Sequence, residues 1–418
     1  MTTARITSFV IALGLGALAA MSCDEPAPPA GEGVDLPSTP CGRGVYVAAT
    51  DDHFQSTSVS IVKWDGTTAS AGILTSGSEA PGLSAALSGD VVAPTTRTES
   101  GQVVLIDRYP AGVLTFFDPR GPTVTGQLSV QTGFASNPQD YLELGDGRAY
   151  VTRYGHNFDP GHEAFDEGND VLVIDTSAPS IVGRIALDEV LAGEAAGLYA
   201  APNRMVRTAG VVVVLVTTYS PDFKTSGDAR LVAIDPETDG IVSVLPLTGL
   251  RGCSGLALSP SGTRIAALCS GTFGGSNNPS IDDAGVAIAS ISGTALAETE
   301  RLDAPTQPLG QSAAFASEDA LLATTLGELD DAGVPLEPDR LVEFDLTSRG
   351  VREILSSKAA SLALGDVRCE AACGACMVAD AGHAAIQRMA IEDGHAGAPT
   401  AFAIDDGTGL PPRWLGGY

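Results

Sequence analysis

A hydrophobic residue followed by aspartate recurs along this chain at a near-constant interval. The pairs are Trp64-Asp65, Phe117-Asp118, Ile174-Asp175, Ile234-Asp235 and Phe344-Asp345. They are separated by roughly fifty-five residues or a small multiple of that number, a period typical of propellers and other repeat arrays. The repeat therefore constrains the architecture before the chemistry of any single residue is considered.

Each period contains four short strand-like segments, here called a to d. In the unit around Asp175 they are residues 139–144, 148–154, 170–175 and 181–187. Glycine-rich turns join a to b and c to d, and a long loop joins b to c, which predicts an antiparallel meander. Four further units follow the same order, ending near Val130, Leu247, Leu302 and Leu355.

The two ends of the chain complete a ring. Residues 44–50 match a b strand with no a strand before it, and residues 410–415 belong to no unit. A last, divergent unit spans 361–405. Pairing the tail with 44–50 completes the first unit and removes exposed sheet edges. We therefore predict an all-β fold: a seven-bladed β-propeller over residues 41–418, closed by N- and C-terminal segments that share a blade.

The recurrent aspartates have two interpretations. They could form a ring of carboxylate ligands, or each could accept hydrogen bonds from backbone N–H groups two residues further on. Because every one falls where strand c turns into strand d, we favour the turn-capping role.

The first residues predict export. Arg5 is followed by an apolar run from Ile6 to Ala20, too short for a transmembrane span and typical of a signal peptide, here residues 1–22. Ala20-Met21-Ser22-Cys23 resembles a bacterial lipobox, although alanine replaces the usual leucine. The resemblance implies a lipid on Cys23, and plain secretion is the alternative. Residues 23–40 are proline-rich and would act as a tether of up to roughly 50 Å.

Charge excludes one class of partner. The chain carries a net charge of −28 and only three lysines, Lys63, Lys224 and Lys358. Such a field repels phosphate backbones, so nucleic-acid binding is not expected. The expected contact with a membrane is through the lipid anchor only, at the bacterial cell envelope, on the periplasmic side or the cell surface.

Several segments resemble one propeller family. Tyr150-Val151-Thr152-Arg153 is similar to the Tyr-Val-Thr-Asn motif of the bacterial YVTN-type β-propeller repeats, with arginine in place of asparagine. Residues 137–140, 171–175 and 258–262 resemble other landmarks of that repeat. The resemblance implies a seven-bladed, often exported propeller, and it implies no particular activity.

Cysteine usage predicts disulfides. Without Cys23 six cysteines remain, an even number in a chain with an export signal. If residues 260–262 form a three-residue hairpin loop, counting outward in steps of two places Cys253 opposite Cys269. We expect a disulfide between them.

The other four cysteines lie at the predicted seam of the ring. Cys369 and Cys376 end strand a and begin strand b of the last blade, with Cys373 in the turn, and Cys41 precedes the first b strand. We predict the pairs Cys369–Cys376 and Cys41–Cys373. A zinc site with Cys41 as fourth ligand is the alternative, but the spacing suits zinc poorly and an oxidising compartment favours disulfides.

Long insertions occur almost only between strands b and c, so they share one face of a propeller. Loops of this length are usually functional or disordered. The blade-three loop is acidic and contains two histidines. Its candidate ligands for a divalent cation are His156, Asp159, His162, Glu163 and Asp166. Their spacing matches no standard metal motif, so a solvated acidic loop is the alternative.

Two Arg-Tyr pairs end b strands in adjacent blades near this face: Arg108-Tyr109 and Arg153-Tyr154. Paired arginines could receive a carboxylate or an anionic sugar, and a blade-to-blade salt bridge is the alternative. Tyr219, at the start of the blade-four loop, belongs to the same candidate ligand face.

Catalytic motifs such as Gly-x-Ser-x-Gly, His-Glu-x-x-His and the P-loop do not occur. Three functions remain. The first is a non-enzymatic envelope lipoprotein that binds a protein or glycan through this face. The second is a metal-dependent hydrolase or lyase with its site on the same face. The third is an outer-membrane assembly or adhesion partner, which would need an apolar patch that these polar loops do not suggest.

Overall fold

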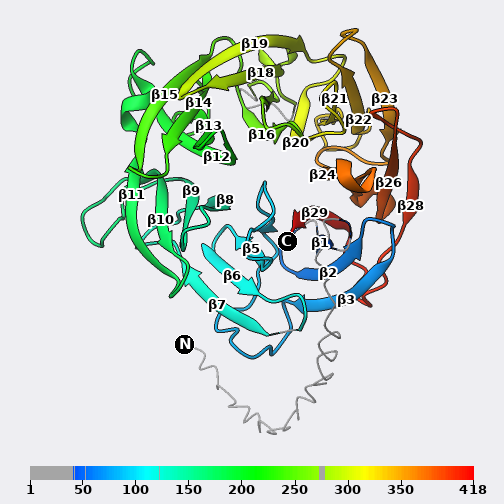
Figure 1. Ribbon diagram of the computed structural model, residues 1–418, viewed down its shortest axis with the longest axis horizontal. Helices are drawn as coiled ribbons and strands as arrows, with labels where there is room; N and C mark the ends of the chain where they lie inside the picture. Colours follow the sequence, from blue (N-terminus) through cyan, green and yellow to red (C-terminus); the bar gives the residue numbers. More distant parts are fainter. Residues whose placement is uncertain (1–40, 42, 52, 122, 273–277) are drawn as a thin grey trace, which may run out of the picture.

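Seven antiparallel sheets surround a central axis in the computed structural model, which describes residues 41, 43–51, 53–121, 123–272 and 278–418 (Figure 1). No α-helix occurs in these ranges, and the four short 3-10 turns lie in connections. The all-β, seven-bladed propeller predicted from the repeat is therefore confirmed. The signal peptide, Cys23 and the tether lie outside the described residues.

Blades two to six follow the predicted a–b–c–d order from the centre outward. Blade two consists of β4 (Val91–Val92), β5 (Val103–Asp107), β6 (Val113–Phe117) and β7 (Val124–Ser129). Blade three consists of β8 (Pro138–Glu143), β9 (Arg148–His156), β10 (Gly168–Asp175) and β11 (Ser180–Ala186). Blade four consists of β12 (Tyr199–Thr208), β13 (Val211–Tyr219), β14 (Ala229–Asp235) and β15 (Gly240–Leu247).

The remaining blades continue around the ring. Blade five consists of β16 (Cys253–Leu258), β17 (Arg264–Cys269), β18 (Gly285–Ser292) and β19 (Ala295–Asp303). Blade six consists of β20 (Leu309–Phe315), β21 (Ala320–Thr325), β22 (Arg340–Asp345) and β23 (Val351–Ser356). Blade seven consists of β24 (Leu364–Glu370), β25 (Ala375–Asp380) and β26 (Ala385–Glu392), whose outer edge pairs with β27 (His395–Ala396) and β28 (Thr400–Phe402).

Blade one joins the two ends of the chain, as expected. Its order is β29 (Pro412–Gly417), β1 (Gly44–Thr50), β2 (Thr57–Lys63) and β3 (Thr68–Thr75). β29 pairs antiparallel with β1, and Val47 lies opposite Leu415. The tail therefore supplies the inner strand that the first repeat lacks.

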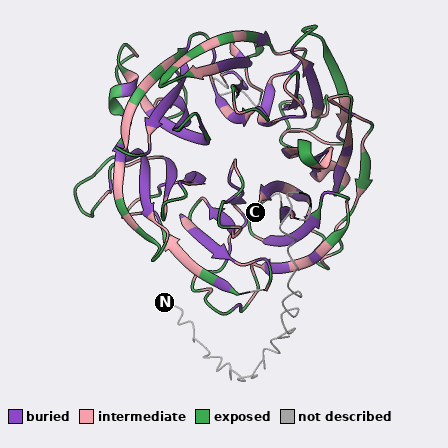
Figure 2. Cartoon of the chain, viewed as in Figure 1, coloured by how far each residue is buried: buried purple, intermediate pink, exposed green. Residues whose placement is uncertain are grey.

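Burial explains the strand sequences. Strands b and c lie between neighbouring blades, so both of their faces are covered, as in β13, whose residues Val211 to Thr218 are all buried. Strand d forms the outer rim, and in β19 intermediate and exposed residues alternate. Figure 2 shows this division, with buried strands inside and mixed burial at the rim. Runs of valine and alanine thus mark the middle of a blade.

The recurrent aspartates cap turns. The carboxylates of Asp65, Asp118, Asp175, Asp235 and Asp345 each accept a hydrogen bond from the backbone N–H two residues further on, at 2.8–2.9 Å. This interaction fixes the turn from strand c to strand d. The aspartates are therefore structural, and they do not form a ligand ring.

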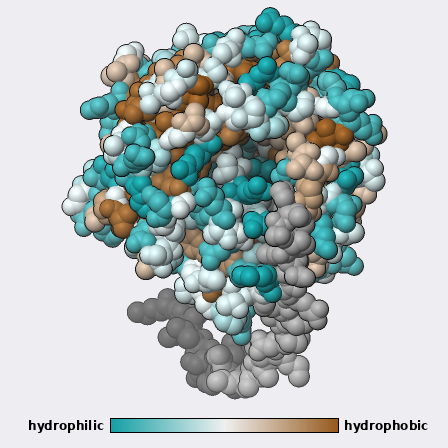
Figure 3. Space-filling view, in the orientation of Figure 1, coloured by the Kyte–Doolittle hydropathy of each residue, from teal (hydrophilic) through white to brown (hydrophobic). Residues whose placement is uncertain are grey.

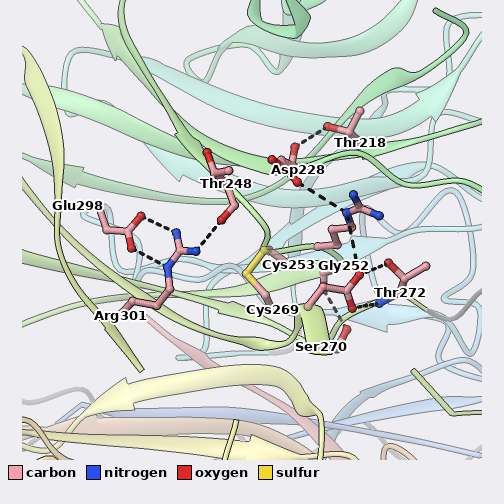
Figure 4. Close-up of a disulfide and its surroundings, with 12 residues drawn as sticks. Thr218, Asp228, Thr248, Gly252, Cys253, Cys269, Ser270, Thr272, Glu298 and Arg301 are labelled. Carbon is pink, nitrogen blue, oxygen red and sulfur yellow. Dashed lines mark hydrogen bonds and ion pairs between the residues drawn. A yellow bond between two sulfur atoms is a disulfide. The ribbon is translucent and has the colours of Figure 1, made fainter. Parts of the chain in front are cut away.

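Three disulfides join the cysteine pairs expected from the sequence: Cys41–Cys373, Cys253–Cys269 and Cys369–Cys376. The argument for the second pair needs one correction, because the hairpin loop is a residue longer than expected and Ala257 faces Ala266. A register shift between Cys253 and Gly255 then brings Cys253 opposite Cys269 (Figure 4). A bulge thus compensates for the longer loop.

The centre of the ring is crossed by the chain. Strand β4 is only two residues long, and residues 93–95 continue into the channel. Arg204 of blade four donates to the carbonyl of Ala93 at 3.1 Å, and Arg368 of blade seven donates to that of Pro94 at 2.7 Å. Because these blades lie on opposite sides of blade two, the segment spans the axis and separates the two mouths of the channel. The ring is visibly hollowed near its centre (Figure 3).

Candidate functional site

The b–c loops gather on one face, here called the loop face. Its described residues are 51, 53–56, 108–112, 157–167, 220–228, 270–272, 278–284, 326–339 and 381–384, together with the connections between blades. The a–b and c–d turns form the opposite face, here called the turn face. This separation follows from the meander, in which b ends where c begins.

Neighbouring loops contact one another. The hydroxyls of Ser226 in blade four and Thr272 in blade five lie 3.0 Å apart. Asn278 of blade five exchanges two hydrogen bonds with the backbone of Leu329 in blade six, at 3.0 and 3.1 Å. The loops of blades four to six therefore form one connected surface.

The disulfide Cys253–Cys269 anchors this surface. Cys253 begins β16 directly after a blade connection, and Cys269 ends β17 directly before the blade-five loop. Beside it Ser270 donates to the carbonyl of Gly252 at 2.9 Å (Figure 4). The other two disulfides involve the a–b turn of blade seven, on the turn face.

The blade-three loop does not assemble the expected cation site. The carboxylate of Asp166 points back into its own loop and accepts hydrogen bonds from the N–H groups of Glu163, Gly161 and His162. These bonds, led by that of Glu163, lower the pKa of Asp166 to about 2. His162 and Asp159 are exposed and lie 3.2 Å apart. Asp166 therefore holds the loop in shape.

His156 is turned away from these carboxylates. Its ring stacks on Tyr199 with 3.8 Å between centroids and meets Phe158 edge-on at 4.7 Å. Nδ1 lies 3.0 Å from the side-chain amide of Asn169, and burial lowers the pKa of His156. Within the described residues, no group of three or more His, Cys, Asp or Glu side chains is arranged to hold a metal ion. The predicted ligands thus do not converge.

The two arginines are not an anion site either. Arg153 is fully buried and pairs with Asp170 of its own blade, with 2.6 Å between Nη2 and Oδ2. Arg108 pairs with Asp90, again within one blade, and stacks over Trp414 at 5.5 Å. Both interpretations of the Arg-Tyr motif therefore need correction: each arginine makes an ion pair inside its own blade.

Arg153 has a structural role that its sequence position did not suggest. Its guanidinium also donates to Thr132 Oγ1 at 2.6 Å and to the carbonyl of Phe165 at 2.7 Å. It therefore links the blade-three loop to the connection from blade two. Packing of neighbouring blades buries the whole side chain of Arg153, and this burial makes its role structural.

The tyrosines lie where expected, and two of them meet. Tyr154 and Tyr219 lie 6.1 Å apart, and Phe223 stacks on Tyr154 at 6.4 Å with an interplanar angle of 10°. The rings contact each other and leave Phe223 62% exposed. Tyr109, on the shorter loop of blade two, is 61% exposed.

Apolar loop tips are the feature that sequence reasoning missed. Of the twelve large hydrophobic side chains exposed among the described residues, eight lie on the loop face. They are Phe54, Tyr109, Phe158, Phe223, Ile281, Val334, Leu336 and Leu362. The other four are valines on outer strands. Each loop presents only one or two such residues among polar ones, so hydropathy along the chain does not reveal them.

The loops around these tips are strongly acidic. The b–c loops of blades three to six contain thirteen carboxylates and one basic side chain, Lys224. The carboxylates are Asp159, Glu163, Asp166, Glu167, Asp222, Asp228, Asp282, Asp283, Glu328, Asp330, Asp331, Glu337 and Asp339. The loop face thus combines apolar tips with negative charge.

Comparison with known proteins supports the fold. No family model matches the sequence, and no curated protein is similar to it in sequence. A candidate 6-phosphogluconolactonase of Bacteroides fragilis matches with a TM-score of 0.55 and 12% identity, over 91% of this chain and 99% of that one. A candidate 6-phosphogluconolactonase of Bacteroides uniformis matches with a TM-score of 0.55 and 11% identity, over 90% of this chain and 98% of that one.

A third match is hydrazine synthase of Kuenenia stuttgartiensis, with a TM-score of 0.50 and 12% identity, over 75% of this chain and 79% of that one. All three are similar to this chain in fold. At such low sequence identity, the similarity in fold gives no evidence for a shared activity. The propeller implied by the YVTN-type resemblance is confirmed, whereas membership of that repeat family stays a prediction.

Proposed function

We propose that this chain is a non-enzymatic binding module of the bacterial envelope that docks a protein partner on its loop face. The exposed side chains at the tips of the b–c loops support the proposal. The four aromatic residues that are exposed in the described part of the chain, Phe54, Tyr109, Phe158 and Phe223, lie on this face. Aromatic side chains anchor protein interfaces because they bury a large area with little loss of conformational entropy.

Backbone conformation adds support. Phe54, Phe223 and Leu362 have positive φ angles of 55°, 57° and 65°. Bulky residues rarely adopt this region, and it costs of order 1–3 kcal/mol at each position. Strain that holds a hydrophobic side chain out in solvent is expected where the side chain contacts a partner.

Charge defines the partner further. Protein interfaces surround apolar anchors with a polar rim. Here the rim is acidic, so the proposed partner carries apolar pockets bordered by lysine and arginine. Electrostatic attraction would speed association and make it sensitive to salt. The third function, recruitment of an assembly or adhesion partner, is one form of this proposal.

The three disulfides support a location outside the cytoplasm. Disulfides persist in oxidising compartments such as the periplasm or the cell exterior, and no helix in the described part of the chain is long and apolar enough to cross a bilayer. With a lipid on Cys23 the ring would be attached to the envelope surface through the tether. The metal-dependent hydrolase is not proposed, because the candidate ligands do not converge.

The test is capture of a partner from envelope extract by the full-length protein and two matched variants. F158S/F223S removes two apolar tips of the loop face, and V182S/V242S removes two exposed valines of outer strands. We expect the first variant to lose a partner that the second retains. Equal capture by both variants, at equal melting temperatures, would contradict docking on the loop face.

A further inference from the structure

The turn face carries the larger mouth of the channel, a cavity of about 610 Å³. It is bordered by the ends of the inner strands and by the a–b turns, and residues 93–95 close it toward the loop face. The mouth on the loop face is only about 90 Å³. The volume on the turn face lies within the usual range of about 300–1,000 Å³ for small-molecule sites.

The wall of this cavity is largely apolar. Strand β16 contributes Leu256 and Leu258, β20 contributes Ala313 and Phe315, and β24 contributes Val367. These residues come from three consecutive blades, so the apolar wall occupies one side of the mouth. Such a wall can cover the hydrocarbon part of a ligand.

The cavity is also lined by positive charge, in contrast to the rest of the molecule. Three arginines line the cavity, Arg43, Arg97 and Arg368, against one acidic side chain, Glu370. The whole chain, by comparison, has a net charge of −28. Cationic side chains thus gather at the mouth of the channel on the turn face.

Two of these arginines are available to a ligand. Arg97 is 52% exposed and makes only a long ion pair with Glu370, at 3.7 Å. Arg43 has no ion-pair partner among the described residues, and its guanidinium lies against the turn at Gly101. Arg368 instead donates to the carbonyls of Leu415 and Pro94, at 2.8 and 2.7 Å, and forms the floor.

We propose that this cavity binds a small anionic amphiphile. Its carboxylate or sulfonate would pair with Arg43 and Arg97, and its apolar body would lie against Leu258 and Phe315. Arginine favours such ligands because its planar fork matches the oxygens of an oxyanion. The site is independent of the loop face, so either can be tested without the other.

The experiment uses 8-anilinonaphthalene-1-sulfonate, an anionic fluorescent amphiphile, titrated into the full-length protein at low ionic strength. R43E and R97E reverse the charge in the cavity. R120E makes the same change on the outer c–d turn of blade two, where Arg120 pairs with Asp118. We expect saturable binding that both cavity variants weaken about tenfold or more, while R120E leaves it unchanged.

Competition with unlabelled amphiphiles shows which charge the cavity selects. Decanoate should displace the probe, and decyltrimethylammonium, with the same chain length and the opposite charge, should not. Binding that is absent, that is equally strong in R43E, or that the cation displaces as well as the anion would overturn the proposal. Binding that F158S/F223S abolishes would place the probe on the loop face and overturn it too.

Discussion

The disulfide Cys41–Cys373 should stabilise the ring more than either of the other two. It joins residues 332 positions apart, whereas Cys253–Cys269 and Cys369–Cys376 enclose 16 and 7. In the chain-entropy model, a crosslink removes conformational freedom from the unfolded state in proportion to the logarithm of the enclosed length. The seam disulfide therefore constrains the unfolded chain most.

The expected magnitudes follow from these separations. The model assigns about 6 kcal/mol to the seam pair, about 3 kcal/mol to Cys253–Cys269 and about 2 kcal/mol to Cys369–Cys376. The seam disulfide has a second role, because β29 and β1 pair next to it without a covalent link of their own. Loss of Cys41–Cys373 should therefore also allow blade one to open locally.

The assay is guanidinium unfolding of three double serine variants, C41S/C373S, C253S/C269S and C369S/C376S, compared with the parent protein. We expect the free energy of unfolding to fall most in C41S/C373S, with faster hydrogen exchange in β1 and β29. If C41S/C373S loses no more stability than C253S/C269S, the reasoning from loop length is wrong. Unchanged exchange at the seam would show that strand pairing alone holds the ring closed.

Three further predictions follow from single residues. Arg153→Met should lower the free energy of unfolding by about 1–3 kcal/mol, because the buried Asp170 loses one of its two arginine partners and keeps Arg184 at 2.9 Å. Denaturant titration measures this change, and an unchanged midpoint would contradict it. Burial raises the pKa of Asp339 to about 6, above its usual value of 3.8, so this group favours folding below pH 4 and that contribution is lost as the pH rises to 6. Asp339→Asn should therefore remove a fall in stability of up to about 3 kcal/mol over this range, and identical pH profiles of variant and parent would refute the assignment. Cys23→Ser should move the protein from the membrane fraction to the soluble fraction, as immunoblotting would show, and an unchanged distribution would exclude lipid anchoring at this position.

The fold was predictable because its signals are local and repeated. The aspartate caps, the glycine turns and the alternation of strands each depend on residues close in sequence, and seven copies reinforce one another. The pair Cys253–Cys269 was also predictable, although its register was not. A bulge at Ser254 offset the longer hairpin loop, and such bulges depend on packing with the next blade.

The candidate site was less predictable because exposure is a tertiary property. Arg153 and Arg108 occupy equivalent places in the repeat, yet only Arg153 is fully buried. Phe158 and Phe165 lie in one loop, and only Phe158 is largely exposed. No local pattern separates the members of either pair, since neighbouring blades decide which side chain they cover.

The sequence alone determined the ring, its closure by the two chain ends, the disulfide pairs and the face that carries the long loops. These features depend on the periodicity and spacing of residues, which the order of amino acids gives directly. Tertiary structure decided that the histidines and carboxylates of blade three stay apart, that the apolar tips stand out, and that arginines gather at the opposite mouth. These properties arise between blades, where residues distant in sequence meet and compete for the same space.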